Sequence, residues 1–191
     1  ARELAASRSG SSPLDTTQAE LASRRVSEEA EKLLLGLSTF AYSAGAAYSN
    51  ANIYGYTNFP SRITKTMTSP TTGGWTPATL IEEVLSMKQS SVNAYQYGPW
   101  MLYFSTAWDK YLDDDYSAAK GDLTLRNRLA QIDNIQGVRT LDYLTNYDVL
   151  LVQMTSDVVR MVIGMPLTVV QWESHGGMLL NFKVMLINVP Q

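Results

Sequence analysis

The only histidine of the chain, His175, is the first candidate for chemistry, because an imidazole can act as a general base near neutral pH. A Ser–His–Asp triad would have to use it, yet the sequence has no G-x-S-x-G motif to supply a nucleophile. Two glycines follow this histidine, between strand-like stretches, in the run "QWESHGGMLL". Glycine supports a positive φ in a tight connection. The pattern therefore favours a histidine that turns a hairpin over a catalytic one.

Three adjacent carboxylates, Asp113, Asp114 and Asp115, are the second candidate. Carboxylate oxygens bind hard cations, but a calcium loop needs alternating ligands, and this run does not alternate. Because charge runs usually face water, we expect a solvated helix end or loop. The basic residues that follow and could offset this negative charge are Lys120, Arg126 and Arg128.

Composition excludes several classes of chemistry. The chain has no cysteine, which rules out disulfides, thiolate catalysis and cysteine-based zinc sites. Its net charge of -3 and pI near 5.1 argue against a dedicated nucleic-acid binder, which needs clustered Lys and Arg. The "TTGGW" stretch lacks the Gly-Lys-Ser/Thr of a phosphate loop. We therefore predict a protein that is not an enzyme and has no catalytic residues, cofactor or metal site.

The amount and distribution of apolar residues predict a soluble, folded chain. Its 191 residues are 45% hydrophobic, which is enough for a well-filled core in one domain or in two closely joined lobes. The longest apolar runs fall far short of the ~20 residues of a membrane-spanning helix. The opening "ARELAASRSG" lacks the apolar core of a secretory signal. We expect neither membrane insertion nor export.

Two long helices are predicted in the first half of the chain. The first lies in "PLDTTQAELASRRVSEEAEKLLLG", where Thr17 and Glu20 form a capping-box pair and Gly36 is a natural stop. Its narrow stripe of apolar residues is typical of a helix that lies across a sheet. The second helix follows Thr76, with Pro77 in its first position and Leu80, Ile81, Val84, Leu85, Val92 and Tyr95 facing inward.

The segment between these helices, residues 38–74, is rich in Tyr, Asn, Ser, Thr, Gly and Pro. It could be disordered low-complexity sequence or an ordered loop with short strands. Its many aromatic and branched side chains favour the ordered loop.

The second half of the chain alternates between short helices and strands. The run "DVLLVQMT" is almost continuously apolar, which predicts a strand buried on both faces. The aromatic residues of "NAYQYGPWMLYFSTAWDKY" indicate a core or an interface rather than base stacking. The other predicted strands are "PWMLYFS", "GVRTLDYL", "LTVVQWES" and "MLLNFKVMLI", and the short helices are "TAWDKYL" and "LTLRNRLAQI". The fold class is therefore α+β.

The order of these motifs resembles a known family. The motifs are the capped helix "DTTQAELASRRVSEEAEKLLLG", then "IYGYTNFPSR", "GGWTPATLIEEV", "QIDNIQGVRTLDYL", "DVLLVQMTSDVVRMVIG" and "VVQWESHGGMLLNFKVMLINVPQ". Together they resemble the shell proteins of tailed bacteriophages and encapsulins, which share the Hong Kong 97-type capsid fold. The resemblance covers nearly the whole chain.

The resemblance implies a subunit with two lobes. Residues 1–74 and 162–191 look like the peripheral domain, in which a spine helix at residues 13–36 crosses a sheet that includes the C-terminal strands. Residues 75–161 look like the axial domain, an α/β lobe. An N-terminal arm and an extended loop precede the spine helix in this family, whereas only about a dozen residues precede it here. We expect either that both are absent or that the chain is a processed or truncated subunit.

The function implied by the resemblance is that of a major capsid protein. Such a chain would assemble with itself into pentamers and hexamers of an icosahedral capsid, contact other virion proteins, and touch no membrane. The capsid would enclose the packaged DNA without binding it specifically, and its location would be the virion, after assembly in the host cytoplasm. Residues 113–122 would lie at the tip of the axial domain and meet their copies around a ring axis. The implied subunit-interface residues are Asp113, Asp114, Asp115, Lys120, Arg126 and Arg128.

Two other functions stay open at this point. An encapsulin-type nanocompartment would have the same fold and would enclose a cargo enzyme instead of a genome. An uncharacterised hydrolase would depend on His175, and loss of turnover on its substitution would support that reading.

Overall fold

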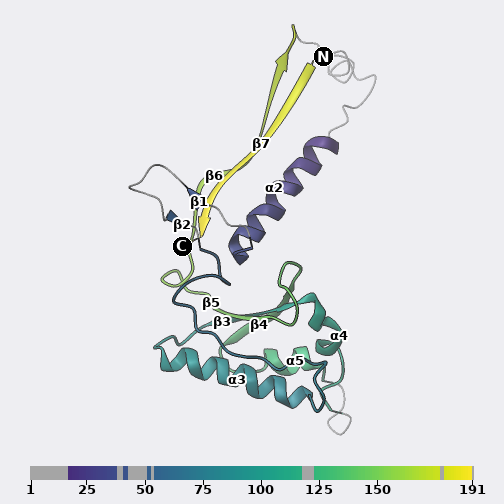
Figure 1. Ribbon diagram of the computed structural model, residues 1–191, viewed down its shortest axis with the longest axis vertical. Helices are drawn as coiled ribbons and strands as arrows, with labels where there is room; N and C mark the ends of the chain where they lie inside the picture. The colour runs from purple at the N-terminus through teal and green to yellow at the C-terminus, as the bar shows by residue number, and fades with distance from the viewer. Residues whose placement is uncertain are drawn as a thin grey trace. The chain divides into compact units, whose positions relative to one another are not determined.

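The chain folds into α+β structure in two compact units. The first unit consists of residues 1–57 and 161–191, and the second unit of residues 58–160. A computed structural model describes residues 17–37, 41–42, 51–52, 54–117, 123–176 and 179–190 (Figure 1).

The boundary between the units differs from the expected one at residue 74. Residues 58–74 belong with the second unit, because Met67 and Trp75 pack against its core. The amide and hydroxyl of Thr68 also donate to Glu83 Oε1, over 2.9 and 2.6 Å. The other expected boundary, at residue 161, is one residue from the observed one.

The first unit contains the predicted long helix, α2 (Thr17–Leu35). Gly36 ends it in the left-handed conformation, with φ of +79°, as the sequence predicted. The amide of Leu37 then donates to the carbonyl of Lys32 over 2.9 Å. Two short strands, β1 (Ala41–Tyr42) and β2 (Ala51–Asn52), pair antiparallel within the segment expected to hold short strands. Residues 13–16 of the expected helix lie outside the described residues.

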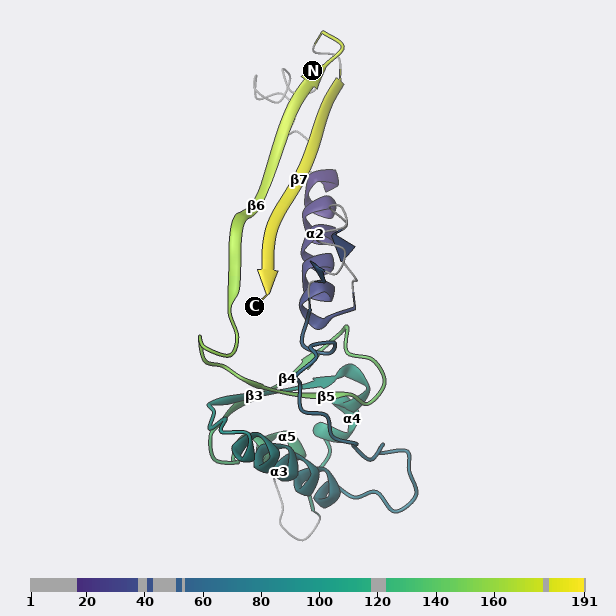
Figure 2. The same ribbon diagram turned by 60° about the vertical axis from the view of Figure 1, so that its left-hand side comes forward.

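A long hairpin completes the first unit. Strands β6 (Met161–Ser174) and β7 (Leu179–Pro190) run antiparallel, with irregular register between Ile163 and Thr168. Helix α2 packs along this hairpin, chiefly on β7 (Figure 2). The predicted packing of the long helix on the C-terminal strands is confirmed, but the helix runs alongside the strands instead of across them.

The second unit is a three-stranded sheet with helices. Helix α3 (Pro77–Asn93) starts as predicted, since the hydroxyl of its N-cap, Thr76, accepts from the amide of Thr79 over 3.4 Å. The sheet order is β4-β3-β5, in which β3 pairs parallel with β4 and antiparallel with β5. The remaining elements are β3 (Trp100–Ser105), η2 (Thr106–Trp108), α4 (Asp109–Leu112), α5 (Leu125–Ala130), β4 (Ile135–Leu141) and β5 (Val149–Gln153).

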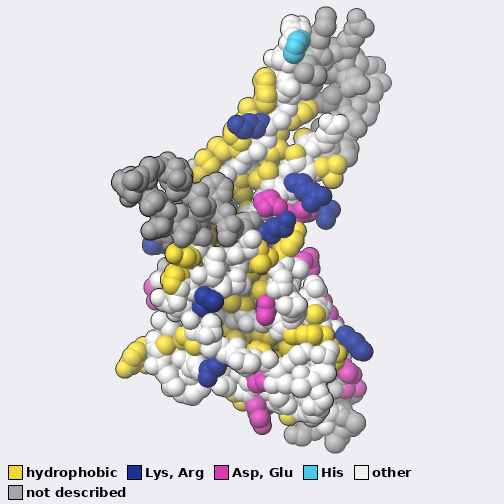
Figure 3. Space-filling model, in the orientation of Figure 1, with side chains coloured by type: hydrophobic (Ala, Val, Ile, Leu, Met, Phe, Trp, Pro, Cys, Tyr) yellow, Lys and Arg dark blue, Asp and Glu magenta, His cyan; other side chains and the backbone are white. Residues whose placement is uncertain are grey.

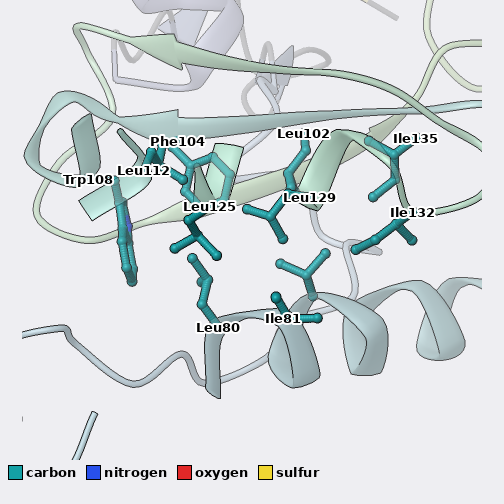
Figure 4. Close-up of a cluster of buried hydrophobic side chains, with 11 residues drawn as sticks. Leu80, Ile81, Leu102, Phe104, Trp108, Leu112, Leu125, Leu129, Ile132 and Ile135 are labelled. Atoms are coloured by element: carbon teal, nitrogen blue, oxygen red, sulfur yellow. The ribbon is translucent and has the colours of Figure 1, made fainter. Parts of the chain in front are cut away.

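The core of the second unit lies between α3, α5 and the sheet. Leu80 and Ile81 of α3 point toward Leu102 of β3 and Leu129 of α5 (Figure 4). Trp108 is fully buried and donates from Nε1 to the carbonyl of Tyr147 over 3.0 Å. The rings that surround Trp108 are Trp75, Phe104, Tyr111 and Tyr147. The aromatic-rich stretch therefore contributes a core.

Two expectations about burial in this unit are wrong. Strand β5 is mostly half-buried, with only Val152 buried, because it lies at the edge of the sheet instead of between two strands. On α3, Leu85 is 44% exposed, and Tyr95, beyond the end of the helix, is 81% exposed. Tyr95 has a φ of +62°, which takes it out of the helical path.

Candidate functional site

The acidic segment, residues 113–122, lies between α4 and α5. The amide of Leu125 donates to the carbonyl of Asp114 over 3.1 Å, and an isolated antiparallel bridge pairs Asp115 with Thr124. Thr124 is also the N-cap of α5. These bonds bring the two ends of the segment together at the start of α5.

One basic side chain ties this region together, forming what we call the Arg126 cluster (Arg126, Asp109 and Asp113). Arg126 donates from Nε to Asp113 Oδ1 over 2.9 Å and from Nη2 to Asp109 Oδ1 over 3.0 Å. Partial burial by itself would lower the pKa of Arg126, but the hydrogen bonds and charges of both carboxylates outweigh it and raise the pKa. The guanidinium therefore stays charged and holds the end of α4 against α5.

The cluster changes the role expected for Arg126. This side chain was expected to offset the aspartates across a subunit interface, but it pairs with carboxylates of its own chain. Arg128 makes no ion pair with any described residue, and Lys120 lies outside the described residues. The exposed carboxylates of the run that Arg126 does not bind are Asp114 and Asp115.

Sequence reasoning missed Asp109. The signal was present, since Asp109 and Asp113 are four residues apart and would share one face of a helix. The local sequence did not show that α5 lies beside α4 and brings Arg126 to that face.

His175 lies in the turn of the β6–β7 hairpin, as predicted. It has a φ of +53° and Gly176 a φ of +65°. Its Nδ1 is 3.3 Å from the hydroxyl of Ser174, which also accepts from Asn181 Nδ2 over 2.9 Å. The contacts of this histidine are those of a polar turn residue.

The hairpin exposes an unusual amount of apolar surface. Among the strand residues whose side chains the structure describes, nine large hydrophobic ones are exposed, up to 64% for Ile163. Hydrophobic side chains are visible at the surface along this hairpin (Figure 3). In the core of the second unit, by contrast, Leu102 and Phe104 are fully buried. The nine side chains are Met161, Val162, Ile163, Leu167, Val169, Val170, Trp172, Ile187 and Val189.

Directly opposite residues on paired strands point to the same face, so the register divides the hairpin into two faces. Gln171 pairs with Phe182 and Val169 with Val184. Glu173 lies two residues beyond Gln171 on the same side, which we call the Glu173 face. Val170 pairs with Lys183 and Trp172 with Asn181 on the other side, the Lys183 face.

Among the described residues, no three His, Asp or Glu side chains come together in a way that could hold a metal ion. None of the described helices is long and apolar enough to cross a membrane.

The sequence matches one family model, described as a family of unknown function (DUF6260), over residues 2–173. The chain belongs to this family. No curated protein matches the sequence. The matched region takes in the second unit, α2 and all of β6 except its last residue. It thus includes the Arg126 cluster and most of the exposed hydrophobic residues of the hairpin.

Proposed function

We propose that the chain is a shell subunit that assembles with itself into an icosahedral phage capsid and encloses the genome. The proposal rests on one observation above all, the exposed apolar surface of the β6–β7 hairpin. Monomeric proteins rarely expose contiguous apolar patches larger than a few hundred Å², and larger patches usually mark surfaces of association.

The incomplete coverage of the hairpin by other parts of its own chain supports a role for it in association. A two-stranded hairpin is marginally stable in water unless another layer covers it. Helix α2 packs chiefly along β7, and most of β6 stays exposed. Protein layers on both faces of β6 would bury Val169 and Trp172, which lie on opposite faces and are each 45% exposed, and Ile163, which is 64% exposed. Such burial stabilises by about 25 cal/mol per Å² of apolar surface.

The organisation of the chain agrees with the resemblance to shell proteins. One unit has a long helix packed along long C-terminal strands, and the other has an α/β core of its own. This division is the one that the resemblance implies for a peripheral and an axial domain, although fold alone does not determine function.

The test is assembly of the purified full-length chain. We expect fast-sedimenting particles in analytical ultracentrifugation and closed icosahedral shells in negative-stain images. A chain that remains a monomer as its concentration is raised would contradict the proposal.

The contents of the shells distinguish a phage capsid from a nanocompartment. A capsid subunit expressed with its virion partners should yield particles that protect DNA from nuclease. Particles that retain a specific protein cargo and no DNA would instead indicate a nanocompartment.

A further inference from the structure

The two faces of the β6–β7 hairpin carry opposite charges. Among residues 161–190 the only acidic side chain is Glu173 and the only lysine or arginine is Lys183. The register places Glu173 on one face and Lys183 on the other, and both side chains are exposed.

Each charge has apolar neighbours that are also exposed. On the Lys183 face, Val170 and Trp172 are 40% and 45% exposed. On the β6 side of the Glu173 face, Val169 is 45% exposed. Each face therefore combines exposed apolar side chains with one Glu or Lys side chain, and these two charges have opposite signs.

Helix α2 leaves part of the Glu173 face accessible. On β7, Phe182, Val184 and Leu186 are half-buried, whereas Lys183 and Ile187 are exposed. Since α2 packs along β7, we infer that it covers the β7 side of the Glu173 face. On β6, Val169 and Glu173 of that face remain exposed, and on the Lys183 face Val170, Trp172 and Lys183 are exposed while Asn181 and Met185 are half-buried.

We propose that the Lys183 face of one chain docks on the β6 side of the Glu173 face of a second copy of the same chain. This inference rests on the proposed function and deepens it by naming the contact. The Lys183 ammonium of one copy pairs with the Glu173 carboxylate of the next, in a contact that also contains Val170 and Trp172 on one side and Val169 on the other. Packed sheets lie about 10 Å apart, a separation at which long side chains from both layers meet.

Charge complementarity favours a copy of the chain as the occupant, and it favours a head-to-tail arrangement. Two Lys183 faces packed symmetrically would bring two ammonium groups into an apolar contact with no counter-charge, which is costly. Two Glu173 faces would do the same with carboxylates. A contact between unlike faces satisfies both charges and leaves each copy with one free face. Such heterologous contacts continue from subunit to subunit and close into rings where the rotation permits.

The experiment reverses the charges in the full-length chain and measures self-association by sedimentation velocity over a range of concentrations. K183E makes both faces acidic, and E173K makes both faces basic. We expect each variant to self-associate roughly tenfold more weakly than the wild type, since attraction becomes repulsion. The double variant E173K/K183E, which exchanges the charges of the two faces, should associate within roughly threefold of the wild type.

Mixing the two single variants provides a test that misfolding cannot mimic. A mixture of K183E and E173K should associate, because the acidic faces of one variant meet the basic faces of the other. Each variant by itself should self-associate only weakly. The matched controls are K65E and E82K, which make the same changes of charge at exposed positions of the second unit and should behave as the wild type.

The outcomes separate this inference from the proposed function. Closed shells that form equally well from the single variants would overturn the docking contact and leave the shell function standing. Charge-dependent association that never yields shells would support the contact and overturn the shell function. A double variant as weak as the single variants, or a mixture that does not associate, would also overturn the contact.

Discussion

At the scale of single residues, the acidic run is partly neutralised before any second molecule approaches. Arg126 binds Asp113 and Asp109 of its own chain at 2.9 and 3.0 Å. The three side chains are 29%, 65% and 44% exposed respectively, so solvent screens the pairs and their contribution is modest. Their effect is mainly on geometry, because they hold α4 and α5 together where the acidic segment leaves and returns.

Replacing Arg126 by Met should lower the free energy of unfolding by about 1 kcal/mol at low ionic strength. The substitution keeps an apolar stem and removes the guanidinium, which leaves Asp109 and Asp113 without their shared cation. The loss should shrink in 1 M salt, where the Debye length is about 3 Å. Urea unfolding at the two salt concentrations measures both effects.

The matched control for that change is Arg128 to Met. Arg128 lies on the same helix and forms no ion pair with any described residue. Its replacement should therefore change stability by no more than about 0.5 kcal/mol and without dependence on salt. Equal losses for both variants would mean that the Arg126 pairs do not hold the segment.

His175 should tolerate Asn far better than Val. Its φ of +53° lies in the left-handed region, which Asn adopts readily and a β-branched residue does not. We expect H175N to change the free energy of unfolding by less than about 1 kcal/mol and H175V to lower it by about 1–2 kcal/mol. Urea unfolding of both variants checks this, and equal losses would show that the turn conformation is not what constrains this position.

At the scale of elements, the sequence correctly predicted the features that depend on residues close together in the chain, such as the ends of helices. The beginning of α3 follows from Thr76 and Pro77, and the end of α2 follows from Gly36, because caps act within one helical turn. The alternation of side chains in "MLLNFKVMLI" predicted β7, and the strand predicted in "LTVVQWES" forms the second half of β6, which begins earlier, at Met161. None of these features needs knowledge of the rest of the chain.

Features that depend on tertiary neighbours could not be predicted in this way. Strand β5 is apolar along its length, but its burial depends on its place at the edge of the sheet order β4-β3-β5. The assignment of residues 58–74 depends on contacts of Met67 and Thr68 with the second unit. The Arg126 cluster joins side chains 13 and 17 residues apart, a separation at which no local pattern predicts pairing.

A glycine controls how residues 54–57 meet the end of α2. A Cβ on Gly55 would lie 2.3 Å from the Gly36 amide nitrogen and 2.6 Å from the Leu34 carbonyl oxygen, both backbone atoms. The same segment is held by a hydrogen bond from the amide of Tyr56 to that carbonyl, over 2.9 Å. Gly55 to Ala should therefore force the segment off the helix and lower the free energy of unfolding by about 2 kcal/mol or more.

Gly73 to Ala is the matched control for Gly55. A Cβ at Gly73 would meet nothing within 4 Å, so its effect on stability should stay within about 0.5 kcal/mol. Thermal unfolding of both variants compares them directly. A Gly55 variant as stable as the Gly73 variant would show that the helix end and residues 54–57 separate without cost.

At the scale of the whole molecule, the two units differ in how completely they bury their apolar residues. The second unit has a closed core in which Leu80, Phe104 and Trp108 are fully buried. The first unit has Leu35 fully buried beside a hairpin whose side chains are largely exposed. We therefore expect the second unit to hold its shape in the free chain and the hairpin to gain most from assembly.

Of the three adjacent aspartates, Asp114 and Asp115 should affect assembly most, because Arg126 already pairs with Asp113. If copies of this segment meet around a ring axis, as the proposed function implies, several pairs of carboxylates repel one another there. Replacing Asp114 and Asp115 together by Asn should lower the concentration needed for assembly at low ionic strength. It should also reduce the gain in assembly that added salt brings to the wild type. Light scattering at a series of salt concentrations measures both effects.

The control for this change removes two carboxylates elsewhere in the chain, so that it has the same net charge as the Asp114 and Asp115 variant. Glu82 to Gln with Asp142 to Asn does so at two exposed positions of the second unit. If both double variants shift assembly equally, the effect comes from net charge and not from the place of the acidic segment. A shift confined to the Asp114 and Asp115 variant would mean that these carboxylates approach one another between subunits, since charges farther apart than the Debye length of about 10 Å at 0.1 M salt are largely screened.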